Sequence, residues 1–106
     1  MRSNRNRKAA ESRWMDFVAE QGCQFSLMNT EQIHHCAGGT ARSNKVDIGE
    51  FYILPLTTHW HNWLHNEAGQ ARRQIEKALF FEMVYRMEGS SHLITDEVLE
   101  AIRVWR

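Results

Sequence analysis

The segment between Ile33 and His65 constrains the fold of this chain most, because five of its six histidines fall inside it. The pair His34-His35 ends one short run, and a second, apolar run follows after a long polar loop. The other three histidines, at positions 59, 61 and 65, come directly behind that second run. Histidine is the commonest metal-binding side chain and the usual general base near neutral pH. The segment therefore predicts a site for a metal ion or for proton transfer.

The composition is that of an ordinary globular domain. The chain has 106 residues, of which 42% are hydrophobic and 25% charged, so one domain with one core is expected. The formal net charge is +0 and gives no support for nucleic-acid binding, but bases crowd the start of the chain and acids prevail from 76 to 100. We expect a basic flexible arm over residues 1–8 and a single domain over 9–106.

The compartment is indicated by what the sequence lacks. No apolar run approaches the ~20 residues of a membrane span, and the start has no signal-peptide core. Nothing near Cys23 and Cys36 suggests secretion, so we interpret both as reduced thiols. The sequence predicts a cytoplasmic protein that does not contact membranes.

In the first half of the chain, periodicity predicts one helix. Trp14, Phe17 and Val18 recur at helical spacing, which favours a helix over residues 9–21. Gly22 is typical of a helix end. The next residues, 23–30, are expected to form a loop or a poor strand.

Two short segments are predicted to pair as strands. Gln32–His35 and Phe51–Leu54 are compatible with strands of one hairpin, joined by the long loop 36–50. Such a loop exceeds the usual hairpin length, and long ordered loops are often functional. Pro55 is expected to stop the second strand, because proline donates no ladder hydrogen bond.

The second half of the chain is predicted to be helical. Thr57 or Thr58 caps a helix that runs to about Glu67, and Thr95 starts the last helix. Between them, residues 70–87 form the strongest predicted helix, with an apolar stripe broad enough for a core helix or a dimer interface. The stripe comprises Ile75, Leu79, Phe80, Met83, Val84 and Met87. The inward residues of the last helix are Val98, Ile102 and Trp105.

The spacing of the histidines predicts which of them can meet. His61 and His65 are four residues apart, about 40° around a helix axis, so their imidazoles can converge on one ion. His59 lies about 200° from His61 and should point elsewhere. His34 and His35 point to opposite sides of a strand, although twisting near a strand end can bring both towards one cleft.

Such an arrangement suits the hydrolysis of a phosphodiester. A histidine kept off the metal can deprotonate water, and a cation held by neutral imidazoles can contact the scissile phosphate and the leaving oxygen. Arg42 and Lys45, in the loop, can neutralise further phosphate charge as DNA-binding residues.

Simpler interpretations exist for each feature. A lone pair of histidines four residues apart is usually a surface coincidence, and a basic start is more often a solvated tail than a DNA contact. Trp60, Trp63 and Leu64 are better explained as core residues than as groups that stack on nucleobases. The combined order of strand, paired histidines, basic glycine-containing loop, strand, helix and two further histidines is what favours a site.

That order resembles the HNH, or ββα-metal (His-Me finger), endonucleases over about Gly22 to Gly69. The combination Ile-His-His, Gly-Gly, Ile-Leu-Pro-Leu and His-x-x-x-His is most similar to phage recombination-enhancement (Ref-type) nucleases and their small prophage relatives. The resemblance implies that His34, His61 and His65 are metal ligands and that His35 is the general base.

The chain also departs from the family pattern. Tyr52 falls near the position that usually holds the central asparagine or histidine of the motif, and neither Asn44 nor Asn62 can be assigned to that base-orienting role. Many relatives carry paired cysteines for a second, structural zinc ion.

At the positions of those cysteines, Cys23 is followed three residues later by Ser26, and Thr57 replaces another cysteine. A structural zinc ion is therefore not expected. Packing against the flanking helices must then hold the small motif together.

The resulting expectation is an α+β domain with a ββα-metal core, an N-terminal helix and two C-terminal helices. Its expected activity is endonucleolytic cleavage of DNA with one divalent metal ion. Three histidines suit zinc, nickel or manganese better than magnesium. Open coordination positions would still allow magnesium to bind. The expected partners are DNA, a protein activator in recombination and a second copy of the chain. The resemblance implies that the chain itself is a phage or prophage protein.

Two other classes remain open. The chain can be a catalytically silent nucleic-acid-binding or recombination accessory protein, which the departure at Tyr52 favours. Alternatively, the histidines can form a closed zinc site in a structural interaction module, with His59 or Cys36 as the fourth ligand.

Overall fold

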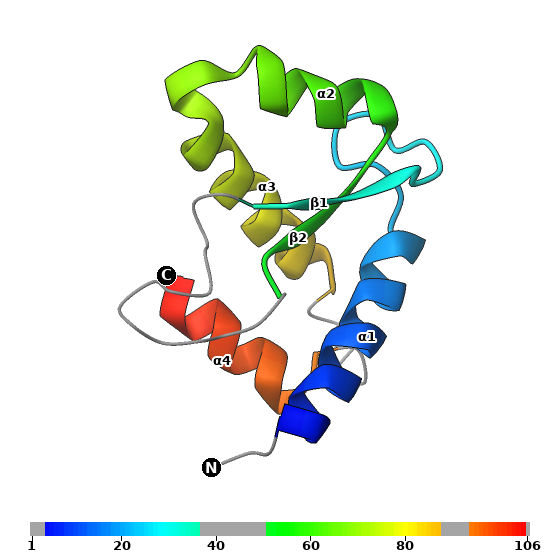
Figure 1. Ribbon diagram of the computed structural model, residues 1–106, viewed down its shortest axis with the longest axis vertical. Coiled ribbons are helices and arrows are strands. Elements are labelled where there is room, and N and C mark those ends of the chain that lie inside the picture. The colour runs from blue at the N-terminus through cyan, green and yellow to red at the C-terminus, as the bar shows by residue number, and fades with distance from the viewer. Residues whose placement is uncertain (1–3, 37–50, 88–93, 106) are drawn as a thin grey trace.

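A two-stranded antiparallel sheet lies between helices in the computed structural model, which describes residues 4–36, 51–87 and 94–105, with side chains from Lys8 onward (Figure 1). The chain is α+β, as predicted. The elements are α1 (Asn4–Glu20), β1 (Gln32–His35), β2 (Ile53–Leu56), α2 (Thr58–Asn66), the short 3-10 helix η2 (Gly69–Ala71), α3 (Arg72–Met87) and α4 (Asp96–Trp105). In Figure 1, α2 crosses one side of the sheet, and α1 and α4 lie on the other.

Helix α1 begins earlier than predicted. Residues 4–8, which were expected to belong to a flexible arm, form its first turns. The predicted end is confirmed: α1 stops at Glu20, and Gly22 follows with φ +81°. This left-handed conformation favours glycine, and a Cβ there would lie 3.2 Å from the carbonyl oxygen of Met28.

The sheet confirms the first predicted strand and corrects the second. Strand β1 occupies residues 32–35, as predicted, but β2 lies two residues later than predicted and includes Pro55. In the register, His34 faces Leu54 and Ile33 faces Pro55.

The expectation that Pro55 stops the second strand is wrong for a geometric reason. The Cys36 N–H donates to the Tyr52 carbonyl at 2.9 Å, and hydrogen-bonded pairs alternate with non-bonded pairs along an antiparallel ladder. Pro55 therefore falls in a non-bonded pair, where its nitrogen faces away from β1. On that outer side its carbonyl accepts the Gln24 N–H at 3.0 Å.

The loop between α1 and β1 is tied to the rest of the domain by a buried side chain. Besides its backbone bond to β2, Gln24 donates from Nε2 to the Leu79 carbonyl at 3.2 Å and accepts from Arg86. These bonds join the loop to α3 as well as to the outer edge of β2.

The core fills the space between the sheet and the helices. Two of the apolar positions that predicted α1, Trp14 and Val18, are buried, and the Trp14 indole N–H donates to the Phe51 carbonyl at 2.9 Å. Most of the predicted α3 stripe is buried within this chain, so it serves as a core face. The buried apolar residues of α3 are Phe80, Met83, Val84 and Met87. The buried residues of α4 are Val98, Ala101, Ile102 and Trp105.

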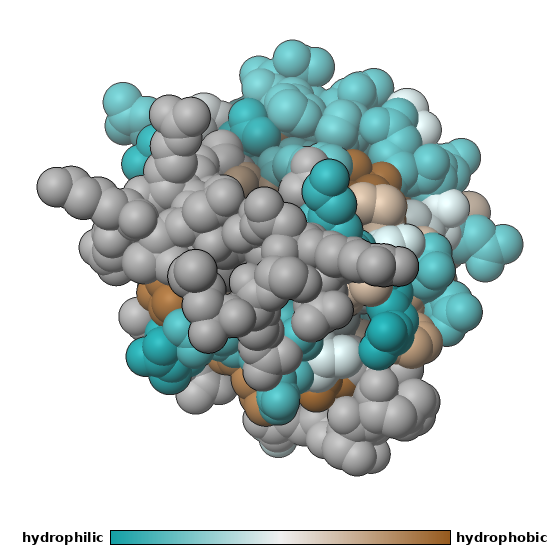
Figure 2. Space-filling view, turned by 60° about the horizontal axis from the view of Figure 1, so that its bottom comes forward, coloured by the Kyte–Doolittle hydropathy of each residue, from teal (hydrophilic) through white to brown (hydrophobic). Residues whose placement is uncertain are grey.

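The surface of the described residues is mostly polar. Figure 2 shows hydrophilic side chains gathered along the upper part of one face, with hydrophobic ones visible only as separate spots. The large apolar side chains that are exposed are Leu27, Met28, Tyr85 and Leu99. Among the described helices, none has the length and apolar character needed to cross a membrane.

Replacing Trp14 by phenylalanine should destabilise the fold by about 2 kcal/mol, because the change removes a buried hydrogen bond and leaves a void under the sheet. Urea unfolding of the two proteins measures this difference. Tyr85→Phe is a matched control, since Tyr85 is 75% exposed and should change stability by less than about 0.5 kcal/mol. An equal effect of both substitutions would contradict the role given to Trp14.

Candidate metal centre

His34 provides the buried side of the candidate site. It lies on β1 with a side chain that is fully buried, and the neighbouring His35 is exposed, as strand alternation requires. A buried imidazole needs partners for both ring nitrogens. For His34 these partners come from α2 and α3.

Helix α2 is anchored so that two histidines face His34. The Glu31 carboxylate accepts the Thr58 N–H at 2.9 Å at the first turn, which suits the positive end of a helix dipole. Leu64 is buried beneath the helix, and Trp60 stacks on Phe25 with ring centroids 4.3 Å apart. Thr57 precedes the helix as predicted, although its side chain makes no capping bond.

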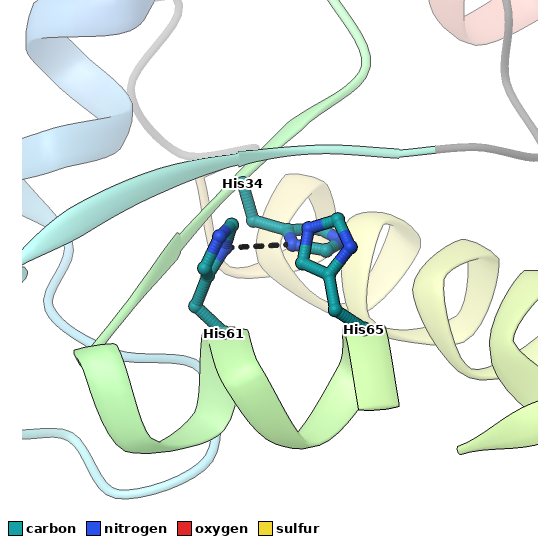
Figure 3. Close-up of side chains that lie close together, drawn as sticks. All are labelled: His34, His61 and His65. Carbon is teal, nitrogen blue, oxygen red and sulfur yellow. Dashed lines mark hydrogen bonds between the residues drawn. The ribbon is translucent and has the colours of Figure 1, made fainter. Parts of the chain in front are cut away.

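His34, His61 and His65 converge, with one candidate ligand atom from each lying within 4.8 Å of the others. In Figure 3, His61 and His65 rise from α2 towards His34 on the strand. The Nδ1 atoms of His34 and His61 are 3.1 Å apart. Two nitrogens bound to one tetrahedral zinc ion at 2.0–2.1 Å lie about 3.3 Å apart. The predicted convergence is confirmed, and the identity of an ion is not determined by it.

Glu76 and Arg72 complete the site behind His34. Oε2 of the fully buried Glu76 contacts Nε2 of His34, and Nε of Arg72 donates to the same oxygen at 3.0 Å. Carboxylates that accept from the second nitrogen of a metal-binding histidine are a common feature of metal sites.

Neither Glu76 nor Arg72 was predicted. One signal was present: Glu76 lies four and seven residues before Phe80 and Met83, so it is an acid on the buried face of α3. An acid at such a position indicates a partner in the interior.

The surroundings of His61 and His65 favour their neutral imidazoles. The pKa of His61 is lowered by burial first, and by the nearby charges of His34, His65 and Arg72. The pKa of His65 is lowered by burial and by Arg72, against an opposing effect of Glu76. Neutral imidazole is the form that binds a metal ion.

The candidate fourth ligands are not part of the group. His59 is exposed on α2, where its ring lies against Trp60, and it is not a member of the histidine group. Cys36 is a buried free thiol whose pKa is raised well above its usual value by burial and by Glu76. Among the described residues, the group that could hold an ion therefore consists of three histidines without a fourth ligand, and His65 is its exposed member.

The remaining predicted site residues have different positions. His35 is outside the cluster but close enough for its charge to contribute to the lowered pKa of His61. Arg42 and Lys45 lie outside the described residues, as does Asn44. Asn62 is exposed on α2.

Tyr52, near the central motif position, is a core residue. Its hydroxyl donates to the Ala101 carbonyl at 2.8 Å, and its ring packs against Phe80 and Trp105. Burial, with the nearby charge of Glu100, raises its pKa to about 12. Tyr52 therefore joins the segment just before β2 to α4, and its hydroxyl bond is directed away from the histidine cluster.

The residues at the positions of the family's structural cysteines, Cys23, Ser26 and Thr57, lie together. Cys23 Sγ is 3.9 Å from Thr57 Oγ1. Burial raises the Cys23 pKa, but hydrogen bonds from Ser26 and from the Thr57 and Phe25 backbone outweigh it, so the pKa is lowered overall. The three positions form one polar contact between the loop and the start of α2.

Comparison with known proteins gives no relative. No protein-family model, no curated protein and no solved structure matches this chain.

The metal-free protein should lose stability as the pH falls below about 6.5. Because the pKa values of His61 and His65 are lower in the folded state, the unfolded chain binds more protons below that pH. Urea unfolding at pH 7.5 and 5.5 measures the change. Replacing both histidines by glutamine should reduce the dependence, and a double variant as pH-sensitive as the parent would contradict this explanation.

Proposed function

We propose that this protein is a divalent-metal-dependent endonuclease of the HNH type, which hydrolyses phosphodiester bonds of DNA. The observation that carries the proposal is the convergence of His34, from a strand, with His61 and His65, from the helix that follows the sheet. Three protein ligands are typical of catalytic metal sites, whereas structural zinc sites are closed by a fourth protein ligand.

The second element of the proposal is a base that does not bind the metal. His35 is exposed beside His34 and lies within electrostatic range of His61. An exposed imidazole can accept a proton from water and return it to solvent. We assign to His35 the role of general base.

The buried face supports a ligand role for His34. With both of its ring nitrogens in contact with side chains, His34 is held in one orientation. When bound, a divalent ion would act as a Lewis acid that stabilises charge on the scissile phosphate and the leaving oxygen. Arg42 and Lys45 remain the proposed contacts to the DNA backbone.

A second candidate is a metal-binding accessory protein that holds nucleic acid without cleaving it. The burial of Tyr52 favours this alternative, because its hydroxyl is engaged by α4 and cannot orient His35. Both candidates share the metal centre and differ in catalysis.

Cleavage of supercoiled and single-stranded DNA by metal-stripped protein, with magnesium, manganese, zinc or nickel returned separately, tests the proposal. We expect nicking that depends on metal. His35→Ala should reduce the rate by at least about 100-fold with metal binding intact, and His34→Ala should weaken metal binding itself.

His59→Ala is the matched control, because His59 is an exposed histidine of the same helix that lies outside the cluster. Its activity should equal that of the parent. Tight metal binding and DNA binding without cleavage would support the accessory protein, and cleavage by His35→Ala at the parent rate would rule out the assigned base.

A further inference from the structure

We infer that Glu76 is a positioning residue for the metal centre: with Arg72 behind it, Glu76 holds His34 as the tautomer protonated at Nε2, so that Nδ1 is the nitrogen presented to the ion. This inference rests on the metal centre of the proposed function. It assigns a role to two residues of α3 that lie outside the ββα arrangement.

The ionised form of Glu76 determines the direction of the hydrogen bond. An ionised carboxylate can only accept, so its contact through Oε2 with His34 Nε2 requires a proton on Nε2. A neutral imidazole carries one proton, which leaves Nδ1 with a free lone pair. Nδ1 is the atom that faces His61 at 3.1 Å.

Arg72 supplies the charge that a buried carboxylate requires. The Glu76 side chain is fully buried and that of Arg72 is 24% exposed, and their contact joins residues four apart on α3. An unpaired buried carboxylate would be costly in free energy. The guanidinium therefore maintains Glu76 as an anion that can accept from His34.

The same arrangement raises the quality of His34 as a ligand. An acceptor behind the ring increases the basicity of the opposite nitrogen and removes the entropy cost of orienting the ring when the ion binds. His61 and His65, on α2, are more exposed than His34. His34 is therefore the most rigidly held of the three ligands.

Zinc affinity and the protonated nitrogen of His34 test the inference. Glu76→Met removes the acceptor but fills the same space, and Glu76→Gln retains an acceptor oxygen without the charge. We expect zinc affinity to fall 10- to 100-fold in Glu76→Met, with a smaller loss in Glu76→Gln. Glu82→Gln is the matched control, because Glu82 is exposed on the same helix, and it should bind zinc as the parent does.

Nitrogen-15 NMR of the imidazoles at pH 8, without metal, reads the tautomer directly. We expect His34 of the parent to be protonated at Nε2 and this preference to be lost in Glu76→Met. Protonation of the parent's His34 at Nδ1 would overturn the inference, as would parental zinc affinity in a folded Glu76→Met. If Glu76→Met does not fold, Glu76→Gln replaces it in the test. Parental zinc affinity in Glu76→Gln, with His34 of that variant protonated at Nδ1, would then overturn the inference.

Failure of the proposed function gives a different result. A parent that binds no zinc, nickel, manganese or magnesium overturns the metal centre, whatever the tautomer of His34. Zinc binding that depends on Glu76, without any cleavage of DNA, supports the inference and removes only the nuclease.

Discussion

The carboxylate of Glu76 lies in the interior of a small domain, and a buried charge of this kind requires donors around it. Two of them come from different elements: His34 from β1 and Arg72 from α3 itself. The position of α3 against the sheet is therefore coupled to the orientation of His34. Packing and site geometry depend on the same contact, so a change in either is expected to disturb the other.

The two strands and α2 form a small motif with little apolar core of its own. Helices α1, α3 and α4 supply the apolar residues that support it. Trp14 bonds from α1 to the backbone just before β2, and Tyr52 bonds from the same segment to α4. Both contacts involve the two residues before β2, and β2 pairs with β1, the strand that carries His34. The strands are four residues long, so these flanking contacts determine where the sheet lies.

Local patterns were sufficient for some of these features. The spacing of His61 and His65 predicted their convergence, because both belong to one helix and its geometry is regular. Glu76 could not be placed, since it lies 42 residues after His34 and meets it only through the packing of α3 on the sheet. The predicted end of β2 was wrong because the prediction considered only the missing N–H of Pro55. It did not include the register of the sheet, which turns the Pro55 nitrogen outward. The assignment of His35 as a base remains a prediction.

The position of Pro55 also affects how the sheet can grow. Exposed strand edges recruit further strands, from the same chain or from another copy, through unpaired backbone groups. On the outer edge of β2, Pro55 has no N–H to offer, and its carbonyl is already bonded to Gln24. An incoming strand would find neither a donor nor a vacant acceptor at that residue. The proline that was expected to end the strand therefore leaves no unpaired backbone group at its position on the outer edge of β2, whose residues are all buried.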